Sequence, residues 1–425
     1  MKRIIFLITI ALTIPSFAQI TISDSVVIGN GYANKAFYSL SNGTVGTMPN
    51  NNWDISVATY TVITASVRIN GGFGVRLWRY SAGDTTSWNA LDTTGLGTQT
   101  GWLECFDQDT AFEASAFEYG MVYPYNYGWG EYNPITHDVN GVALFVMKTH
   151  LGPYKKVWIK NQKAVGNTMT IRVANLDNSA DTTVIFSKNY NTKNYIYFSL
   201  ADMALMDPEP ERFSYDLIFD RYLAYINPPG QYWPVTGVRL NQNTTVHEVR
   251  NTHVDDAVNE MSNIYDLTSS NMTIIGHDWK IQPPPAWTMV DSLSYIISPD
   301  LGNNVYQIWF TGFSGTSTGK YYFNKRQLAW SNIEENNHPI AKITIFPNPA
   351  SDIVNLIYST EQGINAQMLI TDLNGRMIHS RILPSTSGQL STLGFSPYEI
   401  GLKAGVYIIT LSAGNSTQVQ KLIIQ

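Results

Sequence analysis

A segment dense in aromatic residues precedes one of the seven histidines of this 425-residue chain. Residues 117–132 carry seven aromatic side chains, and glycines interrupt them at positions 120, 128 and 130. This spacing is typical of a loop with accessible ring faces, which can stack on a porphyrin or a sugar ring. The alternative is a loop that packs on itself and covers a sheet edge. The candidate ligand-binding residues are Tyr123, Tyr125, Tyr127, Trp129 and His137.

Haem iron bound without covalent attachment takes one or two axial ligands, commonly His, Met, Cys or Tyr. His247 and His253 flank Glu248, and residues six apart on an extended segment share a face. They do not form a His-Glu-x-x-His zinc motif, because residue 251 is Asn. In the alternative interpretation these histidines are exposed polar residues and the methionines fill a core. The candidate haem or metal ligands are His137, His247, His253, Met121 and Met147.

The sequence contains one match to a catalytic motif, but its flanking residues do not suit catalysis. Residues 315–319 match Gly-x-Ser-x-Gly, which in hydrolases requires a strand, a sharp turn and a helix. Here the flanking runs, Val305–Phe310 and Lys320–Asn324, both have the composition of strands, so we predict a hairpin loop. No spaced His/Cys cluster or flanked carboxylate pair accompanies it. We therefore predict that the protein is not an enzyme.

Composition points to an all-β protein without a nucleic-acid partner. The formal net charge is -6 and only 14% of residues are charged, whereas phosphate binding requires clustered Lys and Arg. Cys105 is the single cysteine, so no intrachain disulfide can form. The 25 Tyr and 11 Trp suit large β-sheets. Only residues 255–267 have a helical pattern.

The N-terminus has the pattern of a secretory signal peptide, which we place at residues 1–18. Lys2-Arg3 precede an apolar run from Ile4 to Ile14, and Ala18 closes a small-residue exit before Gln19. The run is too short for a bilayer, which takes about 20 apolar residues, and no later segment is longer. We expect no transmembrane helix and export into the periplasm.

The C-terminal segment, residues 343–425, alternates β-branched runs with turn residues. It opens on Pro-Asn-Pro and closes on Lys-Leu-Ile-Ile, and this pairing resembles the sorting domains of the type IX secretion system. The resemblance implies a small immunoglobulin-like β-sandwich, the type IX machinery as partner, and a secreted or outer-membrane surface location. A polar linker is expected at residues 331–342. The sorting-motif residues are Pro347, Asn348, Pro349, Gly405, Tyr407 and Lys421.

An internal repeat organises the middle of the chain. Phe37-Tyr38-Ser39-Leu40 is followed by Trp53-Asp54, and Tyr197-Phe198-Ser199-Leu200 is followed by Tyr215-Asp216. We predict two tandem antiparallel β-units, residues 19–185 and 186–330. The repeated aromatic–Asp pairs are interpreted as scaffold, with each Asp clamping a turn. His150 is interpreted as a solvated turn residue.

The two repeated openings and the three-stranded endings resemble the HmuY-like family of secreted haem-binding proteins. The first copy, with Asn52-Trp53-Asp54-Ile55 and then Asn70-Gly71-Gly72, matches that pattern more closely than the second. The resemblance implies haem as a non-covalent ligand, held by His or Met from loops. Two functions stay open. In one the protein binds haem or a similar planar ligand, and in the other it is a surface adhesin or glycan-binding scaffold.

Overall fold

The computed structural model describes residues 20–61, 64–112, 114–122, 124–189, 192–257, 269, 271–281, 286–299, 304–328, 340–360, 362–373, 375–387, 389–414 and 416–425. The predicted signal peptide, Tyr123, nearly all of the predicted helix and most of the predicted linker lie outside these residues. The chain divides into two compact units, one up to residue 330 and one from residue 331. Both units are built of antiparallel strands, which confirms the all-β prediction.

The first unit contains two β-sandwiches, and the first sandwich is formed by the strands from β4 to β15. Its larger sheet has the order β13-β12-β11-β10-β6-β7, with β9 on β11 and β8 on β9. Its smaller sheet has the order β15-β14-β4-β5. The bounds are β4 (Ile55–Ala58), β5 (Val67–Ile69), β6 (Arg76–Tyr80), β7 (Trp102–Cys105), β8 (Gly130–Tyr132), β9 (Val139–Gly141), β10 (Phe145–Lys148), β11 (Tyr154–Lys163), β12 (Thr168–Asn175), β13 (Thr182–Ser187), β14 (Tyr195–Ser199) and β15 (Ala204–Met206).

The second sandwich takes its strands from both ends of this unit. One sheet has the order β1-β23-β22-β21-β18 and the other β17-β16-β2-β3. A short pair, β19 (Lys280–Ile281) and β20 (Thr288–Met289), lies apart from these sheets. The remaining bounds are β1 (Ile22–Val27), β2 (Asn34–Ser39), β3 (Gly43–Pro49), β16 (Leu217–Ile226), β17 (Gln231–Leu240), β18 (Thr245–Arg250), β21 (Leu293–Ser298), β22 (Val305–Phe313) and β23 (Lys320–Leu328).

Helical structure among the described residues is limited to short 3-10 turns. One of them, η8 (Gly315–Ser317), lies between β22 and β23, so the Gly-x-Ser-x-Gly segment is a hairpin loop as predicted. The others are η1 (Asn30–Tyr32), η2 (Gly71–Phe73), η3 (Thr85–Ala90), η4 (Leu96–Thr98) and η5 (Ala116–Glu118).

The smaller sheet of each sandwich, β15-β14-β4-β5 in the first and β17-β16-β2-β3 in the second, stacks against the other. The unit therefore has four layers of strands, and these two smaller sheets are the inner ones. Their strands alternate between two buried faces, because successive side chains of a strand point to opposite sides. In β2, Ala36 and Tyr38 belong to the core of the second sandwich, whereas Phe37 faces the layer between the sandwiches. That middle layer is aromatic, and its core consists of Phe37, Met48, Trp53, Ala58, Tyr60, Tyr195, Tyr197, Tyr215 and Ile218.

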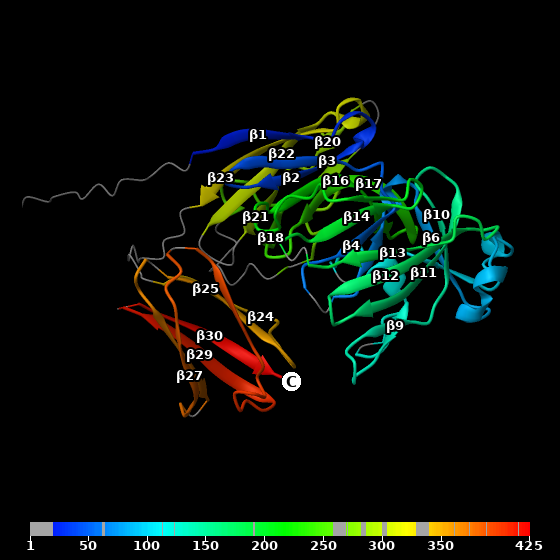
Figure 1. The fold of residues 1–425 in the computed structure, drawn as a ribbon. Helices are drawn as coiled ribbons and strands as arrows, with labels where there is room; N and C mark the ends of the chain where they lie inside the picture. Colours follow the sequence, from blue (N-terminus) through cyan, green and yellow to red (C-terminus); the bar gives the residue numbers. More distant parts are fainter. Residues whose placement is uncertain are drawn as a thin grey trace, which may run out of the picture. The chain divides into compact units, whose positions relative to one another are not determined.

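Strand pairing crosses the division predicted between residues 185 and 186. β14 pairs with β4, with Phe198 opposite Ile55, and β16 pairs with β2, with Leu217 opposite Tyr38. Figure 1 shows this as green strands lying beside blue ones. Each sandwich therefore contains strands from both predicted units. The repeat itself is present, since Tyr38 and Phe198 occupy equivalent places, but each copy pairs its opening strand with the other copy.

The aromatic–Asp pairs of the repeat hold these exchanged strands together. The Asp54 carboxylate accepts from Leu200 N at 2.6 Å, and the Asp216 carboxylate accepts from Leu40 N at 2.7 Å. The rings pack reciprocally as well, with Trp53 edge-on to Tyr197 at 5.0 Å and Phe37 edge-on to Tyr215 at 4.8 Å. These contacts agree with the interpretation of both pairs as scaffold.

The second unit is a small sandwich of a three-stranded and a four-stranded sheet, in the orders β24-β25-β28 and β27-β26-β29-β30. Asn348 joins its first and last segments, because its side chain donates to Lys421 O at 2.6 Å and accepts from Ile423 N at 2.8 Å. The opening and closing motifs of the domain are therefore one structural element. The bounds are β24 (Ile340–Phe346), β25 (Val354–Thr360), β26 (Ala366–Asp372), β27 (Met377–Leu383), β28 (Ser391–Phe395), β29 (Gly405–Ala413) and β30 (Ser416–Ile424).

Candidate functional site

The aromatic segment 117–132 is partly core and partly surface. Phe117 and Trp129 are fully buried in the first sandwich, and the Trp129 indole donates to Ala65 O at 3.1 Å. Tyr127 packs against the same core. Trp129, which the sequence placed among the ligand-binding residues, is therefore a core residue. Burial of this large aromatic side chain lowers the free energy of the fold, and its indole N–H keeps a hydrogen-bond partner in the core.

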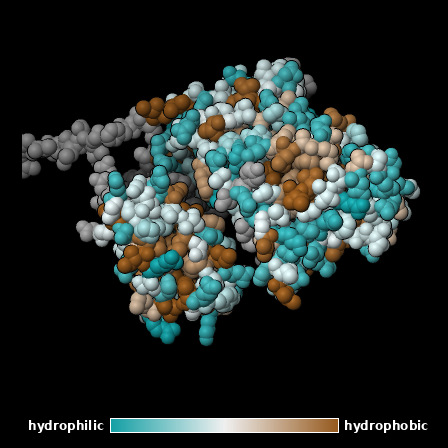
Figure 2. Space-filling view, viewed as in Figure 1, coloured by the Kyte–Doolittle hydropathy of each residue, from teal (hydrophilic) through white to brown (hydrophobic). Residues whose placement is uncertain are grey.

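Two tyrosines of this segment, Tyr125 and Tyr132, form an aromatic ledge together with His137. Tyr125 is 58% exposed and stacks on Tyr132, with ring centroids 6.3 Å apart. The Tyr132 hydroxyl lies 2.6 Å from His137 Nδ1. His137 has a left-handed backbone conformation (φ 60°) in the turn between β8 and β9, which directs it to the surface. Figure 2 shows hydrophobic side chains at the free end of this hairpin, where Ile135 is 88% exposed.

The five candidate axial ligands are spread over the two sandwiches. Met147 is fully buried in the core of the first sandwich, and Met121 is 41% exposed on its surface. His247 lies on β18 opposite Ile296, and the His253 side chain is 68% exposed beside Asp255. No cluster of three His, Cys, Asp or Glu side chains suited to a metal ion occurs in the described part of the chain.

His150 is not a solvated turn residue, contrary to the sequence-based interpretation. Its side chain is 5% exposed, and its Nδ1 lies 2.9 Å from the fully buried Asp54 carboxylate. The His150 backbone N–H donates to the same carboxylate at 2.6 Å. Asp54 is 96 residues earlier in the chain, so the local turn pattern around His150 did not reveal the contact.

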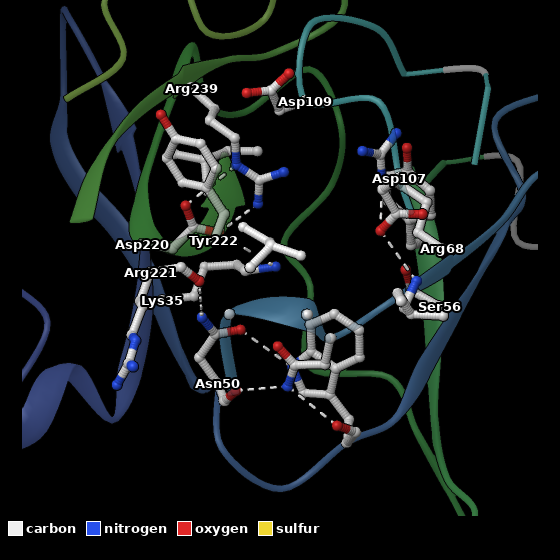
Figure 3. A pocket seen from close by; sticks show the side chains of 18 of the residues that line it. Lys35, Asn50, Ser56, Arg68, Asp107, Asp109, Asp220, Arg221, Tyr222 and Arg239 are labelled. Atoms are coloured by element: carbon white, nitrogen blue, oxygen red, sulfur yellow. Dashed lines mark hydrogen bonds and ion pairs between the residues drawn. The ribbon is translucent and has the colours of Figure 1, made fainter. Parts of the chain in front are cut away.

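A polar cavity of about 60 Å³ lies between the two smaller sheets (Figure 3). Lys35 on β2 and Arg239 on β17 enter it from the second sandwich, and Arg68 on β5 enters it from the first. The turn at Gly71-Gly72 closes one wall. A Cβ at Gly72 would lie 2.6 Å from Arg221 O, so this close approach to β16 requires glycine.

Lys35 is the least satisfied charged group of this cavity. Its side chain is 5% exposed, and its ammonium lies 3.7 Å from the Asp220 carboxylate, beyond hydrogen-bonding distance. The rings of Trp53 and Tyr197 lie 5.1 and 5.2 Å from its nitrogen. No hydrogen bond joins the ammonium to any described residue. Burial lowers the pKa of Lys35, and the Asp220 carboxylate opposes that shift.

Arg239 shares the Asp220 carboxylate with Lys35. Its Nε and Nη2 both donate to Asp220, and its Nη1 has no hydrogen-bond partner among the described residues. One buried carboxylate thus faces two cations. Burial tends to lower the pKa of Arg239, but the contact with Asp220 raises it above its usual value.

Arg68 and Glu209 have hydrogen-bond partners of their own. Arg68 donates to the carbonyl oxygens of Ala111, Phe112 and Gln108, with Asp107 3.8 Å away. Glu209 accepts from Tyr215 Oη at 2.5 Å, Tyr195 N at 2.8 Å and Tyr197 Oη at 3.4 Å. Burial raises the pKa of Glu209 despite these donors.

Sequence reasoning missed this cavity, although a signal for it exists. Arg68 and Arg239 each lie between two buried apolar residues of a strand, and Lys35 and Asp220 each adjoin one. A charged residue in a strand that is apolar on both sides of it indicates a buried polar site when both faces of the sheet are covered. None of the proposed binding or haem-ligand residues lines this cavity.

Comparison with known proteins identifies one part of the chain. Residues 344–425 match the family model described as a secretion system C-terminal sorting domain. This match confirms the type IX sorting domain predicted from the Pro-Asn-Pro and Lys-Leu-Ile-Ile motifs, and it indicates a secreted or outer-membrane surface location. Among curated proteins, none matches the chain. No helix in the described residues is both long and apolar enough to cross a bilayer.

Proposed function

We propose that this protein is exported by the type IX secretion machinery and binds glycans at the aromatic ledge of Tyr125, Tyr132 and His137. The observation that carries the proposal is the open stack of Tyr125 on Tyr132 at the surface of the first sandwich. Sugar rings stack on such faces because their C–H groups pack against an aromatic plane. The proposal describes binding at a cell surface and includes no catalytic step.

His137 complements the ledge with hydrogen-bonding capacity. A neutral imidazole whose Nδ1 accepts a hydrogen bond from the Tyr132 hydroxyl carries its own proton on Nε2. That N–H can donate to a sugar hydroxyl beside the stacked rings. Asn133 holds the same turn, since its side-chain oxygen accepts from Ile135 N at 2.9 Å.

The haem alternative follows from the HmuY-like resemblance, which implies a pair of His or Met ligands around one apolar slot. Met147 is enclosed in the core of the first sandwich, and His137 is hydrogen-bonded to Tyr132. His247 and His253 belong to the second sandwich. These positions favour the glycan proposal over the haem one.

Affinity electrophoresis of the full chain in gels containing dextran, galactomannan, xyloglucan or laminarin tests the proposal. We expect at least one polysaccharide to retard the wild type, and Tyr125→Ala to remove most of that retardation. Tyr322→Ala is the matched control, because Tyr322 is a 40%-exposed tyrosine on β23 of the other sandwich. Equal retardation of all three proteins would place binding elsewhere.

A hemin titration followed by absorbance between about 350 and 650 nm tests the alternative. A saturable shift with low-spin bands that His137→Ala removes would overturn the glycan proposal in favour of haem. A broad change without saturation is the expected result.

A further inference from the structure

The cavity between the two smaller sheets presents hydrogen-bond donors without acceptors. Lys35 Nζ and Arg239 Nη1 both lack a hydrogen-bond partner among the described residues, and both groups line the same space (Figure 3). Lys35 is more than nine-tenths buried. A buried ammonium without an acceptor is costly, because it has lost its hydration shell and gained no equivalent contacts.

The local charge is also uneven. Lys35 and Arg239 each carry one positive charge and share the single negative charge of Asp220, which leaves one positive charge in excess. Arg68 is balanced by Asp107. Glu209 accepts hydrogen bonds from three neutral donors, and burial raises its pKa to about 7. While Glu209 is protonated, the unmatched positive charge lies at the Lys35 and Arg239 side of the cavity.

We propose that this cavity binds a small monocarboxylate, with the carboxylate oxygens accepting from Lys35 Nζ and Arg239 Nη1. A single negative charge cancels the excess, and an anion supplies acceptors to two groups that can only donate. The rings of Trp53 and Tyr197, which flank the ammonium, form an apolar wall for the remainder of the ligand.

The size of the cavity limits the ligand to a few heavy atoms. A cavity of about 60 Å³ has room for roughly four waters, at about 15 Å³ for each. Acetate, with four heavy atoms, falls in this range, and lactate, with six, is a probe of its upper limit, whereas a sugar ring exceeds it. The site is therefore distinct from the aromatic ledge, and none of the ledge residues lines it.

Access comes from the end of the cavity where its lining residues are partly exposed. Gly71, Asp109, Arg221 and Leu223 line this end and are partly exposed. Asp109 Oδ2 also accepts from Tyr225 N at 3.3 Å, which fixes the β16 edge of this rim. We expect a small anion to enter at this end.

Isothermal titration of the full chain with sodium acetate and sodium lactate at constant ionic strength tests the proposal. Acetamide and lactamide are neutral probes of the same shape, and sodium phosphate and sulfate are larger anions with more charge. We expect saturable binding of the carboxylates alone. Affinity should fall as the pH rises from about 7 to about 9, because only the ammonium form of Lys35 attracts the anion.

Lys35→Met removes the ammonium and keeps a side chain of similar length between the two rings. We expect it to weaken carboxylate binding about 10- to 100-fold, the factor associated with one charge-assisted hydrogen bond. Lys280→Met is the matched control. Lys280 is also a buried lysine beside aromatic rings, but its Nζ donates to Thr236 O and His277 O, and it does not line the cavity.

Three results would overturn the proposal. If no anion binds saturably, the cavity holds only water. If phosphate or sulfate binds better than the carboxylates, the match to a single charge is wrong. If Lys35→Met binds lactate as well as the wild type does, the anion occupies another site. The comparison of lactate with lactamide needs no variant, so it decides the question even if Lys35→Met fails to fold.

Discussion

The two sandwiches place an aspartate at the same point of the repeat, but the two aspartates differ in how deeply they are buried. Asp54 is fully buried and accepts from the backbone N–H groups of His150, Leu200 and Ala201 as well as from the His150 ring. Asp216 is partly buried and accepts from Leu40 N. The shared contact is the one that joins the exchanged strands.

The contact that both aspartates make shows how the repeat joins its two copies. The bond from Asp to the backbone of the other copy recurs in both sandwiches, so it is part of the strand exchange. The His150 contact joins the β10–β11 turn to β4 in the first sandwich. The position equivalent to His150 in the second copy, residue 300, lies outside the described residues.

Replacement of Asp54 should have the largest effect on stability. Asp54→Ala leaves buried N–H groups of His150 and Leu200 without acceptors, and we expect a loss of about 3–5 kcal/mol in the free energy of unfolding. Urea denaturation followed by tryptophan fluorescence measures it. Asp92→Ala, at an exposed turn, is the control and should change stability by less than about 0.5 kcal/mol. A loss below about 1 kcal/mol for Asp54→Ala would refute the clamp.

The equivalent change in the second sandwich should cost less. Asp216→Ala removes the acceptor of Leu40 N at a partly buried site that water can reach, so we expect a loss of about 1–2 kcal/mol. The same denaturation experiment gives the comparison. Equal losses for the two variants would show that the difference in burial between the two aspartates does not affect stability.

A buried lysine in each sandwich should make stability depend on pH. Burial lowers the pKa of Lys188 in the first sandwich and of Lys280 in the second to about 7. The unfolded chain binds more protons above that pH, so the free energy of unfolding should rise with pH between about 7 and the usual lysine value near 10.4. Each lysine contributes a slope of about 1.4 kcal/mol per pH unit at most.

Denaturation at pH 7, 8 and 9 measures this slope. Lys188→Met and Lys280→Met should each flatten it, and the double variant should flatten it most. An unchanged slope in either variant would mean that the lysine concerned keeps an ordinary pKa in the folded state.

The smallest expected effect is the coupling within the two reciprocal ring pairs. Double-mutant cycles on Trp53 with Tyr197 and on Phe37 with Tyr215 should each give about 0.5–1.5 kcal/mol, because both pairs meet edge to face at about 5 Å. Similar coupling energies would mean that the two ring pairs stabilise the middle layer equally. A coupling energy near zero in one cycle would mean that the other pair supplies most of this stabilisation.

Local patterns predicted those parts of the molecule that depend on neighbours in sequence. The strands, the hairpin loop at 315–319, the C-terminal domain and the aromatic–Asp scaffold all follow from alternation and turn residues. The repeat was visible because the same short motif occurs twice. Its exchange of strands was not, because a strand presents the same edge to any partner of suitable register.

Contacts between distant segments account for what the sequence did not reveal. His150 looked solvated because its partner Asp54 lies far earlier in the chain. Trp129 looked accessible because glycines surround it, yet its indole N–H donates a hydrogen bond to the carbonyl oxygen of Ala65. The sequence led to no prediction about Lys35, because only the stacking of two sheets encloses it.

The first and last strands of the first unit along the chain constrain the order in which this unit can fold. β1 pairs with β23, so Ile22 lies opposite Lys325 and Val27 opposite Lys320. The strands of the first sandwich lie within residues 55–206, whereas the second sandwich needs strands from both sides of them. Such distant pairings form late, since the intervening chain must be ordered first. A chain that has emerged from the ribosome or the export channel only as far as residue 300 has no partner for β1. The first unit can therefore complete this sheet only after β23, shortly before the sorting domain, has also emerged.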